Sequence, residues 1–135
     1  MAADTDPKLF VVDSSVILSS ILPDEIVPKE LNLIIKKFTK NQVLFFAPTI
    51  LAFEVGNALK SSVKQNRLDQ SKALGIYEFF LSIPVRYITT NHQKTLDLSL
   101  KHNISFYDAS YLSLAQEKKA KLLTLDQKLL ACLPK

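Results

Sequence analysis

The sequence has few of the residues that build disulfide frameworks, flexible linkers or membrane spans. Cys132 is the only cysteine among 135 residues, which excludes an intramolecular disulfide and most thiolate metal sites. Gly56 and Gly75 are the only glycines, and the absence of low-complexity tracts and internal repeats argues against linkers and solenoid arrays. No apolar run approaches the ~20 residues that cross a bilayer, and the N-terminal MAADTDPK lacks the apolar segment of a signal peptide. These absences favour a compact cytoplasmic protein.

Length, composition and charge indicate one small domain with a basic surface. Residues 1–135 fit the usual size of a single domain, and 47% hydrophobic residues suffice for a core. Seventeen basic and thirteen acidic residues give a net charge of +4. If several acids are buried in a site, the remaining surface is more basic, and such a surface favours RNA or DNA as a partner. Lysines at helix ends also complement the helix macrodipole, so the basic clusters alone do not establish this partner.

Four carboxylates each stand as the only charge in an apolar or neutral stretch. They are Asp13 in residues 9–23, Glu54 in 41–59, Asp108 in 103–115 and Asp126 in 122–127. Burial of an unpaired carboxylate is costly, so such groups are usually neutralised, paired or bound to a cation. Four acids in such surroundings therefore predict a metal site.

Strand-like and helix-like segments alternate along the chain. Strands are predicted at residues 8–13, 42–47, 85–89 and 121–125. Helices are predicted at residues 14–22, 28–38, 49–66, 68–83, 91–103, 106–120 and 126–133. The expected apolar faces are Leu31, Ile34, Ile35 and Phe38 on one helix and Leu74, Tyr77, Phe80 and Leu81 on another. The alternation predicts an α/β sandwich on a parallel sheet, with 8–13 as a central strand that is covered on both faces.

This architecture predicts that the four acids meet. Asp13 and Asp126 each follow a predicted strand, and ligands of an open parallel sheet bind beyond the carboxyl ends of its strands. Glu54 lies about one turn inside the helix after the second strand, and Asp108 lies in the first turn of a late helix. Mg²⁺ and Mn²⁺ prefer such oxygen ligands. Singly, each acid could instead cap a helix, complement a helix dipole or join an ion pair.

Four motifs resemble those of a known family. VVDSSV, FEVGNAL, YDASYLSLA and LLTLD, in this order, are similar to the motifs of PIN domains, particularly the VapC-like ribonuclease toxins of type II toxin–antitoxin pairs. The resemblance runs from about Phe10 to Leu130. It implies a PIN-like three-layer α/β/α sandwich with a central, mostly parallel sheet of four to five strands. It also implies catalytic, metal-binding roles for the family's four acids. They correspond to Asp13, Glu54, Asp108 and Asp126, with Mg²⁺ or Mn²⁺ as the cofactor.

Polar residues near these acids are candidates for supporting roles. Ser15 and Thr124 correspond to hydroxyl residues of the family's site, and Asn57 lies on the helix face of Glu54, three residues later. A helix cap, a strand hydroxyl and a surface amide explain these three equally well. Lys60 and Lys64 follow on the same helix and are candidates for contacts with RNA phosphates.

The resemblance implies a metal-dependent endoribonuclease that hydrolyses RNA phosphodiester bonds, with a cognate antitoxin protein and a homodimer as expected assemblies. Apolar residues around the first two helices are candidates for an antitoxin or dimer surface, although core packing explains most of them equally well. They are Ile17, Ile21, Leu22, Ile26 and Val27.

Two other functions stay open. One is a non-catalytic PIN-fold regulatory protein that binds RNA or metal. The other is a haloacid-type phosphatase, which is disfavoured because Ser15 stands where such enzymes have a second aspartate. His92 and His102 lack the spacing of zinc ligands, so a zinc site is not expected.

Overall fold

The computed structural model describes residues 8–134. Residues 1–7, where the sequence lacks the apolar segment of a signal peptide, lie outside the described residues. The strands are β1 Lys8–Val12, β2 Val43–Pro48, β3 Arg86–Ile88 and β4 Lys121–Leu123. The helices are α1 Ser14–Ile21, α2 Lys29–Thr39, α3 Ile50–Lys64, α4 Gln70–Ser82, α5 His92–His102, α6 Phe106–Lys118 and α7 Gln127–Ala131. In this part of the chain, no helix is long and apolar enough to cross a membrane. The predicted alternation of strands and helices is confirmed.

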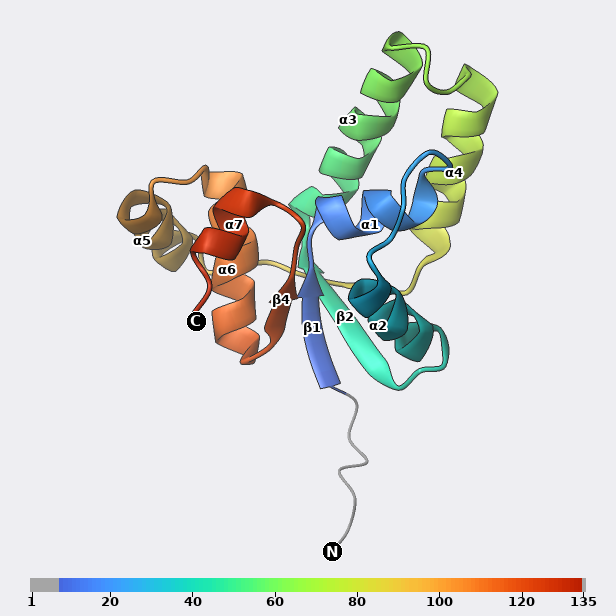
Figure 1. The fold of residues 1–135 in the computed structure, drawn as a ribbon. Helices are drawn as coiled ribbons and strands as arrows, with labels where there is room; N and C mark the ends of the chain where they lie inside the picture. The colour runs from blue at the N-terminus through green and yellow to red at the C-terminus, as the bar shows by residue number, and fades with distance from the viewer. Residues whose placement is uncertain (1–7, 135) are drawn as a thin grey trace, which may run out of the picture.

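The strands form one parallel sheet in the order β3-β2-β1-β4, and Figure 1 shows β2, β1 and β4 side by side. Phe10 of β1 pairs with Phe45 of β2, and Val12 of β1 pairs with Leu123 of β4. The prediction of β1 as a central strand is therefore confirmed. Because the strands are parallel, their carboxyl ends lie at a single edge of the sheet, from which α1 and α3 begin.

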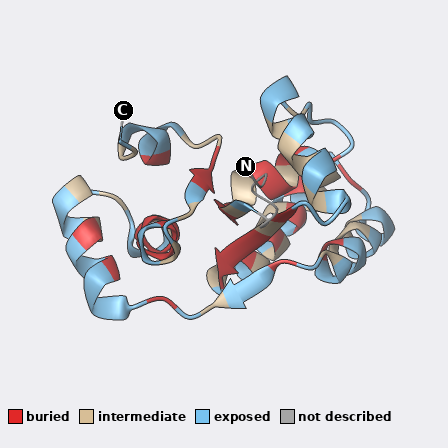
Figure 2. Cartoon of the chain, turned by 90° about the horizontal axis from the view of Figure 1, so that it is seen from below, coloured by how far each residue is buried: buried red, intermediate tan, exposed pale blue. Residues whose placement is uncertain are grey.

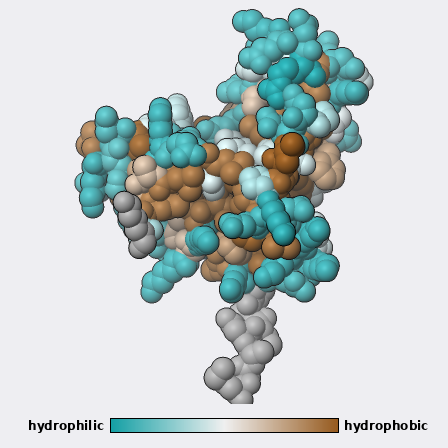
Figure 3. All heavy atoms as spheres, viewed as in Figure 1, coloured by the Kyte–Doolittle hydropathy of each residue, from teal (hydrophilic) through white to brown (hydrophobic). Residues whose placement is uncertain are grey.

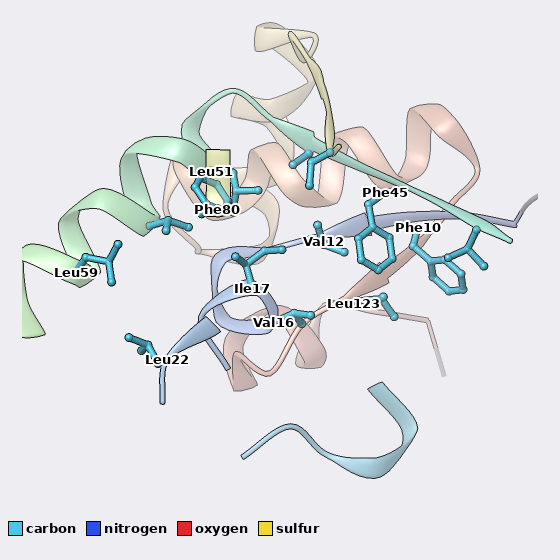
Figure 4. Close-up of a cluster of buried hydrophobic side chains, with 14 of the residues drawn as sticks. Phe10, Val12, Val16, Ile17, Leu22, Phe45, Leu51, Leu59, Phe80 and Leu123 are labelled. Carbon is cyan, nitrogen blue, oxygen red and sulfur yellow. The ribbon is translucent and has the colours of Figure 1, made fainter. Parts of the chain in front are cut away.

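Alternating side chains of the sheet supply two cores, one on each face. Phe10 and Val12 point to a core that is completed by α1 to α4, and Figure 4 shows these side chains between the sheet and the helices. Val11 points the other way, toward Tyr111 of α6 and Leu129 of α7. Figure 2 shows the buried residues concentrated in the sheet and on the helix faces that cover it. The three-layer α/β/α sandwich is confirmed, with α5 packed on the outer side of α6.

The predicted ends of the elements agree with the structure to within about three residues, and β4 shows what limits them. This strand ends at Leu123 rather than at residue 125. Thr124 donates a hydrogen bond to the carboxylate of Asp13, and the Leu125 amide donates one to Ser15 Oγ. Both residues therefore leave the strand ladder to make contacts at the carboxyl edge.

Some predicted apolar surfaces are wrong. On α4, Phe80 is buried and Tyr77 is half-buried, but Leu74 is 67% exposed and Leu81 is 60% exposed. The helix is apolar on more than one side, whereas only one edge of it packs against the core. On α2, Leu31, Ile34 and Phe38 of the predicted face pack on this core and Ile35 is half-buried, although the helix has no fully buried residue.

The apolar candidates for an antitoxin or dimer surface divide in a similar way. Ile17 and Leu22 are buried in the core, which removes them from any free surface. Ile21 and Val27 are half-buried, and Ile26 is 89% exposed. Core packing thus accounts for the first two residues, as the open alternative held.

Two neighbouring phenylalanines of α4 test this assignment of faces. Phe80→Ala is expected to lower the free energy of unfolding by about 3–5 kcal/mol, because Phe80 is 1% exposed and its loss leaves a cavity. The matched substitution Phe79→Ala, at a side chain that is 60% exposed, should cost less than about 1 kcal/mol. Urea unfolding of both variants measures the difference, and equal losses would contradict the observed orientation of α4.

Candidate active site

Asp13 is the most deeply buried of the four acids. It follows β1 directly, forms the N-cap of α1 and is 3% exposed. Its Oδ1 accepts hydrogen bonds from Ser15 Oγ at 2.6 Å and from the Val16 amide at 3.2 Å, and its Oδ2 accepts one from Thr124 Oγ1. The carboxylate is thus a helix cap as well as a candidate ligand, so these two interpretations of Asp13 are compatible.

Ser15 and Thr124 connect two strand ends. The Ser15 hydroxyl donates to Asp13 and accepts a hydrogen bond from the Leu125 amide at 2.8 Å. The Thr124 hydroxyl also donates to Asp13 and accepts from the Asp126 amide at 3.0 Å. This network ties the end of β1 to the end of β4, and it fixes the orientation of the buried carboxylate.

Glu54 on α3 has an unexpected partner on α6. The phenol of Tyr111 donates a hydrogen bond to Glu54 Oε1, although 57 residues separate the two in sequence. Tyr111 is 1% exposed, and burial followed by the charge of Glu54 raises its pKa, so that the phenol stays a donor. The sequence analysis missed Tyr111. One signal was present, because Tyr111 lies three residues after Asp108 in YDASYLSLA and hence on the same helix face.

Asp108 and Asp126 complete the group from the other side of the sheet. Asp108 lies in the first turn of α6, after the cap Ser105, whose Oγ accepts a hydrogen bond from the Asp108 amide at 3.0 Å. Asp126 is the N-cap of α7, and its Oδ1 accepts a hydrogen bond from the Lys128 amide at 2.8 Å. Both side chains are half-buried.

The structure brings these four carboxylates within electrostatic reach of one another. Burial raises the pKa of Asp13 more than the hydrogen bonds from Ser15, Thr124 and Val16 lower it, and the charge of Asp126 raises it further.

Burial and the charges of neighbouring acids also raise the pKa values of Glu54 and Asp108. Burial raises the pKa of Glu54, and the charges of Asp108, Asp13 and Asp126 add to this, while the Tyr111 hydrogen bond opposes it. Burial and then the charge of Asp126 raise the pKa of Asp108, against smaller opposing effects that include the Lys128 ammonium. The negative charge of the four acids is therefore only weakly compensated by nearby positive charge.

These residues fit a divalent cation in chemistry. The donors are all carboxylate oxygens, and the ion pairs of residues 8–134 join Arg67 to Asp24 and Glu25 and involve none of the four acids. In the same residues, no three His, Cys, Asp or Glu side chains are placed to hold one ion together as they stand. Binding of one ion by three of these groups would therefore require the carboxylates to move closer together.

The other predicted residues lie farther along α3. Asn57 is exposed one turn beyond Glu54. Lys60 and Lys64 are exposed at the rim of a largely apolar cavity of about 600 Å³ between α3 and α4. Figure 3 shows hydrophilic residues over the outer end of this helix pair.

A pH dependence of stability follows from the raised pKa values. In the folded protein the protonated forms of Asp13, Glu54 and Asp108 are favoured, so each contributes stability that is full below its unfolded pKa and is lost as pH rises through its folded pKa. With chelator present, we expect a higher melting temperature at about pH 5 than at about pH 7.5. The fall should be smaller for Asp13→Asn. An identical pH profile for this variant would contradict the assigned burial cost.

Two of the acids follow the adjacent strands β1 and β4, and the other two lie on the flanking helices α3 and α6. This arrangement defines a class of α/β proteins with an acidic site at the carboxyl edge of a parallel sheet. A family model described as PIN domain matches residues 10–131. The chain therefore belongs to the PIN-domain family, and the resemblance found in the sequence is confirmed.

Relatives with curated names are VapC ribonucleases. Ribonuclease VapC3 of Pyrobaculum aerophilum is 33% identical over 84 residues, which cover 59% of this chain and 64% of that protein, slightly less than two thirds of its length. Ribonuclease VapC1 of Mycobacterium tuberculosis is 28% identical over 121 residues, which cover 89% of this chain and 91% of that protein.

Two crystal structures share the fold. PAE2754 from Pyrobaculum aerophilum superimposes with a TM-score of 0.72 at 22% identity, over 92% of this chain and 78% of the other. VapC20 of Mycobacterium tuberculosis, described as a Sarcin-Ricin loop cleaving toxin, has a TM-score of 0.62 at 14% identity, over 91% and 94% of the two chains. At these identities the likeness establishes the fold alone.

Proposed function

We propose that this protein is a metal-dependent endoribonuclease of the VapC type, with Asp13, Glu54, Asp108 and Asp126 as its catalytic, metal-binding acids. The observation that carries the proposal is a group of mutually repelling carboxylates, none of which forms a salt bridge with a lysine or an arginine in residues 8–134. The VapC ribonucleases among its relatives supply the reaction class.

The chemistry needs few side chains beyond the acids. A bound Mg²⁺ or Mn²⁺ supplies a water of lowered pKa and neutralises charge on the phosphate that is attacked. The carboxylates hold the cation, and the apolar residues around Asp13 strengthen that hold because they lower the local dielectric. Water is the nucleophile, so the 2′-hydroxyl of RNA is not required and no cyclic phosphate product is expected.

Neighbouring residues keep the acids in position. Ser15 and Thr124 donate to Asp13 and thereby fix the direction of its free lone pairs. Tyr111 donates to Glu54 and leaves its second carboxylate oxygen available. Asn57, one turn from Glu54 and exposed, is assigned to a water or a substrate oxygen at the site. Lys60 and Lys64 are assigned to RNA phosphates farther from the acids.

The proposed protein partners are also inferred from the VapC relatives. We assign the protein as the toxin of a toxin–antitoxin pair, with an antitoxin protein and a second copy of the chain as partners and with a cytoplasmic location. Residues 1–135 are assigned to one PIN-like domain, which the family match over residues 10–131 supports.

Cleavage of a mixed single-stranded RNA tests the reaction. The purified protein should cut it with added Mg²⁺ or Mn²⁺, and the products should lack 2′,3′-cyclic phosphates because water is the attacking group. Metal-dependent RNA binding without turnover would overturn the enzyme assignment in favour of the non-catalytic alternative. Cyclic phosphate ends would contradict attack by water.

Tyr111→Phe tests the positioning role of the phenol. The substitution removes the donor to Glu54 while the ring stays in the core, so we expect cleavage to fall by about 10–100-fold. The metal concentration for half-maximal activity should rise, because Glu54 is no longer oriented. Tyr77→Phe is the matched control, since its phenol donates to the Ala52 carbonyl at 2.8 Å rather than to an acid. A loss of thermal stability with unchanged metal dependence would reduce Tyr111 to a structural role.

A further inference from the structure

A cleft of about 440 Å³ opens between α1 and α3 beside the acids. Ser15 and Leu125, which hydrogen-bond to each other at the carboxyl edge, line its inner part. Because Ser15 also donates a hydrogen bond to the Asp13 carboxylate at 2.6 Å, the cleft adjoins the candidate active site at this residue. Its volume lies within the range of about 300–1,000 Å³ that is usual for small-ligand sites.

One face of α3 joins the acids to this cleft. Ala58, Ser61 and Gln65 line the cleft and follow Glu54 at spacings of four, seven and eleven residues, which repeat on a single helix face. Ser61 is about two turns and Gln65 about three turns beyond Glu54. A ligand chain that leaves the acids along this face therefore enters the cleft.

The walls of the cleft combine apolar side chains with polar side-chain groups that have no hydrogen-bond partner in the described part of the chain. The hydroxyls of Ser19 and Ser62 donate to backbone carbonyls at 2.7 and 3.0 Å. Ser61 and Gln65 are exposed, and the Ser61 hydroxyl and the Gln65 side-chain amide make no hydrogen bond to another described group. Leu18 on the opposite wall presents an apolar side chain. Apolar walls with an amide and a hydroxyl between them suit an unpaired nucleobase, which has a flat face and a polar edge.

The charged residues differ between the cleft and the edge of α3 that faces α4. Glu25 and Arg67 line the cleft, and Arg67 is paired with Glu25 at 3.4 Å and with Asp24 at 2.9 Å. Because these two acids already neutralise the guanidinium, the cleft favours a neutral group over a phosphate. On the edge of α3 that faces the cavity with α4, Lys60 and Lys64 are exposed, and neither has a carboxylate within 4.0 Å in residues 8–134. That edge suits the ribose-phosphate chain.

We propose that the cleft between α1 and α3 binds an unpaired base of single-stranded RNA next to the cleaved phosphate, with Gln65 and Ser61 reading the edge of the base. This rests on the proposed ribonuclease function, and it deepens that function by assigning a substrate subsite. It makes the protein selective for the base at one position beside the cut, and it excludes a fully paired duplex from the site.

Sequencing of cleavage ends from a single-stranded RNA library with random sequence tests the subsite. The unaltered protein should prefer particular bases at one position beside the cut. In the double variant Ser61→Ala, Gln65→Ala this preference should fall by about tenfold or more, which is the usual effect of losing a pair of base-edge hydrogen bonds. Gln116→Ala, at an exposed glutamine of α6 outside the cleft, should keep the original preference. No preference in the unaltered protein, or an unchanged preference in the double variant, would overturn the subsite.

A binding measurement gives a second readout that does not need turnover. In an Asp13→Asn background, Ser61→Trp fills the cleft and should weaken binding of short single-stranded RNA by about tenfold, measured by fluorescence anisotropy. Ser71→Trp, at an exposed serine of α4, is the control for a tryptophan on a helix surface. If Ser61→Trp instead changes the oligomeric state and leaves RNA affinity unchanged, the cleft binds a second copy of this chain rather than RNA, and the proposal fails.

The two levels of the proposal fail in different ways. Hydrolysis of bis(p-nitrophenyl) phosphate by the unaltered protein reports the metal-dependent reaction without the cleft, because this ester carries no base. If neither this ester nor RNA is cleaved, the proposed function falls, and the subsite falls with it. If both are cleaved without base preference, only the subsite is overturned.

Discussion

Asp13→Asn is expected to lower RNA cleavage by about 10³-fold or more, equivalent to about 4 kcal/mol of lost transition-state stabilisation. The substitution keeps an acceptor for Ser15 and the Val16 amide, so the cap of α1 survives. It removes the negative charge that a divalent cation requires at this position. Initial rates on single-stranded RNA with saturating Mg²⁺ measure the loss, and circular dichroism checks the fold.

Stability separates this loss from simple unfolding. Because burial raises the pKa of Asp13, the neutral amide should leave the metal-free protein at least as stable as before at neutral pH. Asp69→Asn is the matched control, since Asp69 caps α4 through the Lys72 amide at 2.7 Å in the same way as Asp13 caps α1. Its activity should stay close to that of the unaltered protein. Full activity of Asp13→Asn would contradict its role as a ligand.

Removal of divalent ions should have an equally large effect. With excess EDTA we expect cleavage to fall by about 10³-fold or more, because no side chain takes over as nucleophile. Addition of Mg²⁺ or Mn²⁺ beyond the chelator should restore the rate, which separates metal loss from other effects of EDTA. Cleavage at the full rate in chelator would contradict the metal-dependent reaction.

The same ions should stabilise the fold. At neutral pH, the ionised acids repel one another, and a cation that binds the folded state alone adds about 2.7 kcal/mol at a concentration one hundred times its dissociation constant. The melting temperature should therefore rise with Mg²⁺ in the unaltered protein, and it should rise much less in Asp13→Asn. Equal shifts in both proteins would indicate that the ion binds elsewhere.

The positions of Asp13 and Asp126 were predictable because topology fixes them. Each follows a strand, and in a parallel sheet the strand ends meet at one edge without any knowledge of side-chain contacts. Their hydrogen-bond partners Ser15 and Thr124 lie within two residues of them in sequence, so short-range spacing was enough to select these hydroxyls.

The bond from Tyr111 to Glu54 was beyond such reasoning. It joins α6 to α3 over the carboxyl edge, and a periodic pattern within one helix contains no information about the helix opposite. The pairing of Arg67 with Asp24, 43 residues apart, was missed for the same reason. Arg67 is paired with Glu25 as well, so this one side chain neutralises both acids that follow Pro23.

The sequence pattern of α4 also did not decide which of its apolar side chains are buried. Leu74 and Leu81 belong to the apolar pattern of the helix as much as Phe80 does, yet only Phe80 is buried. The choice depends on where α3 and the sheet approach the helix.

Crystals grown at neutral pH with Mn²⁺ test the central claim most directly, because anomalous scattering locates the metal independently of activity. The account predicts an anomalous peak at the carboxyl edge, bound by oxygens of Asp13 and of at least one other acid among Glu54, Asp108 and Asp126. The absence of a peak there, with these carboxylates paired to lysine or arginine instead, would contradict it.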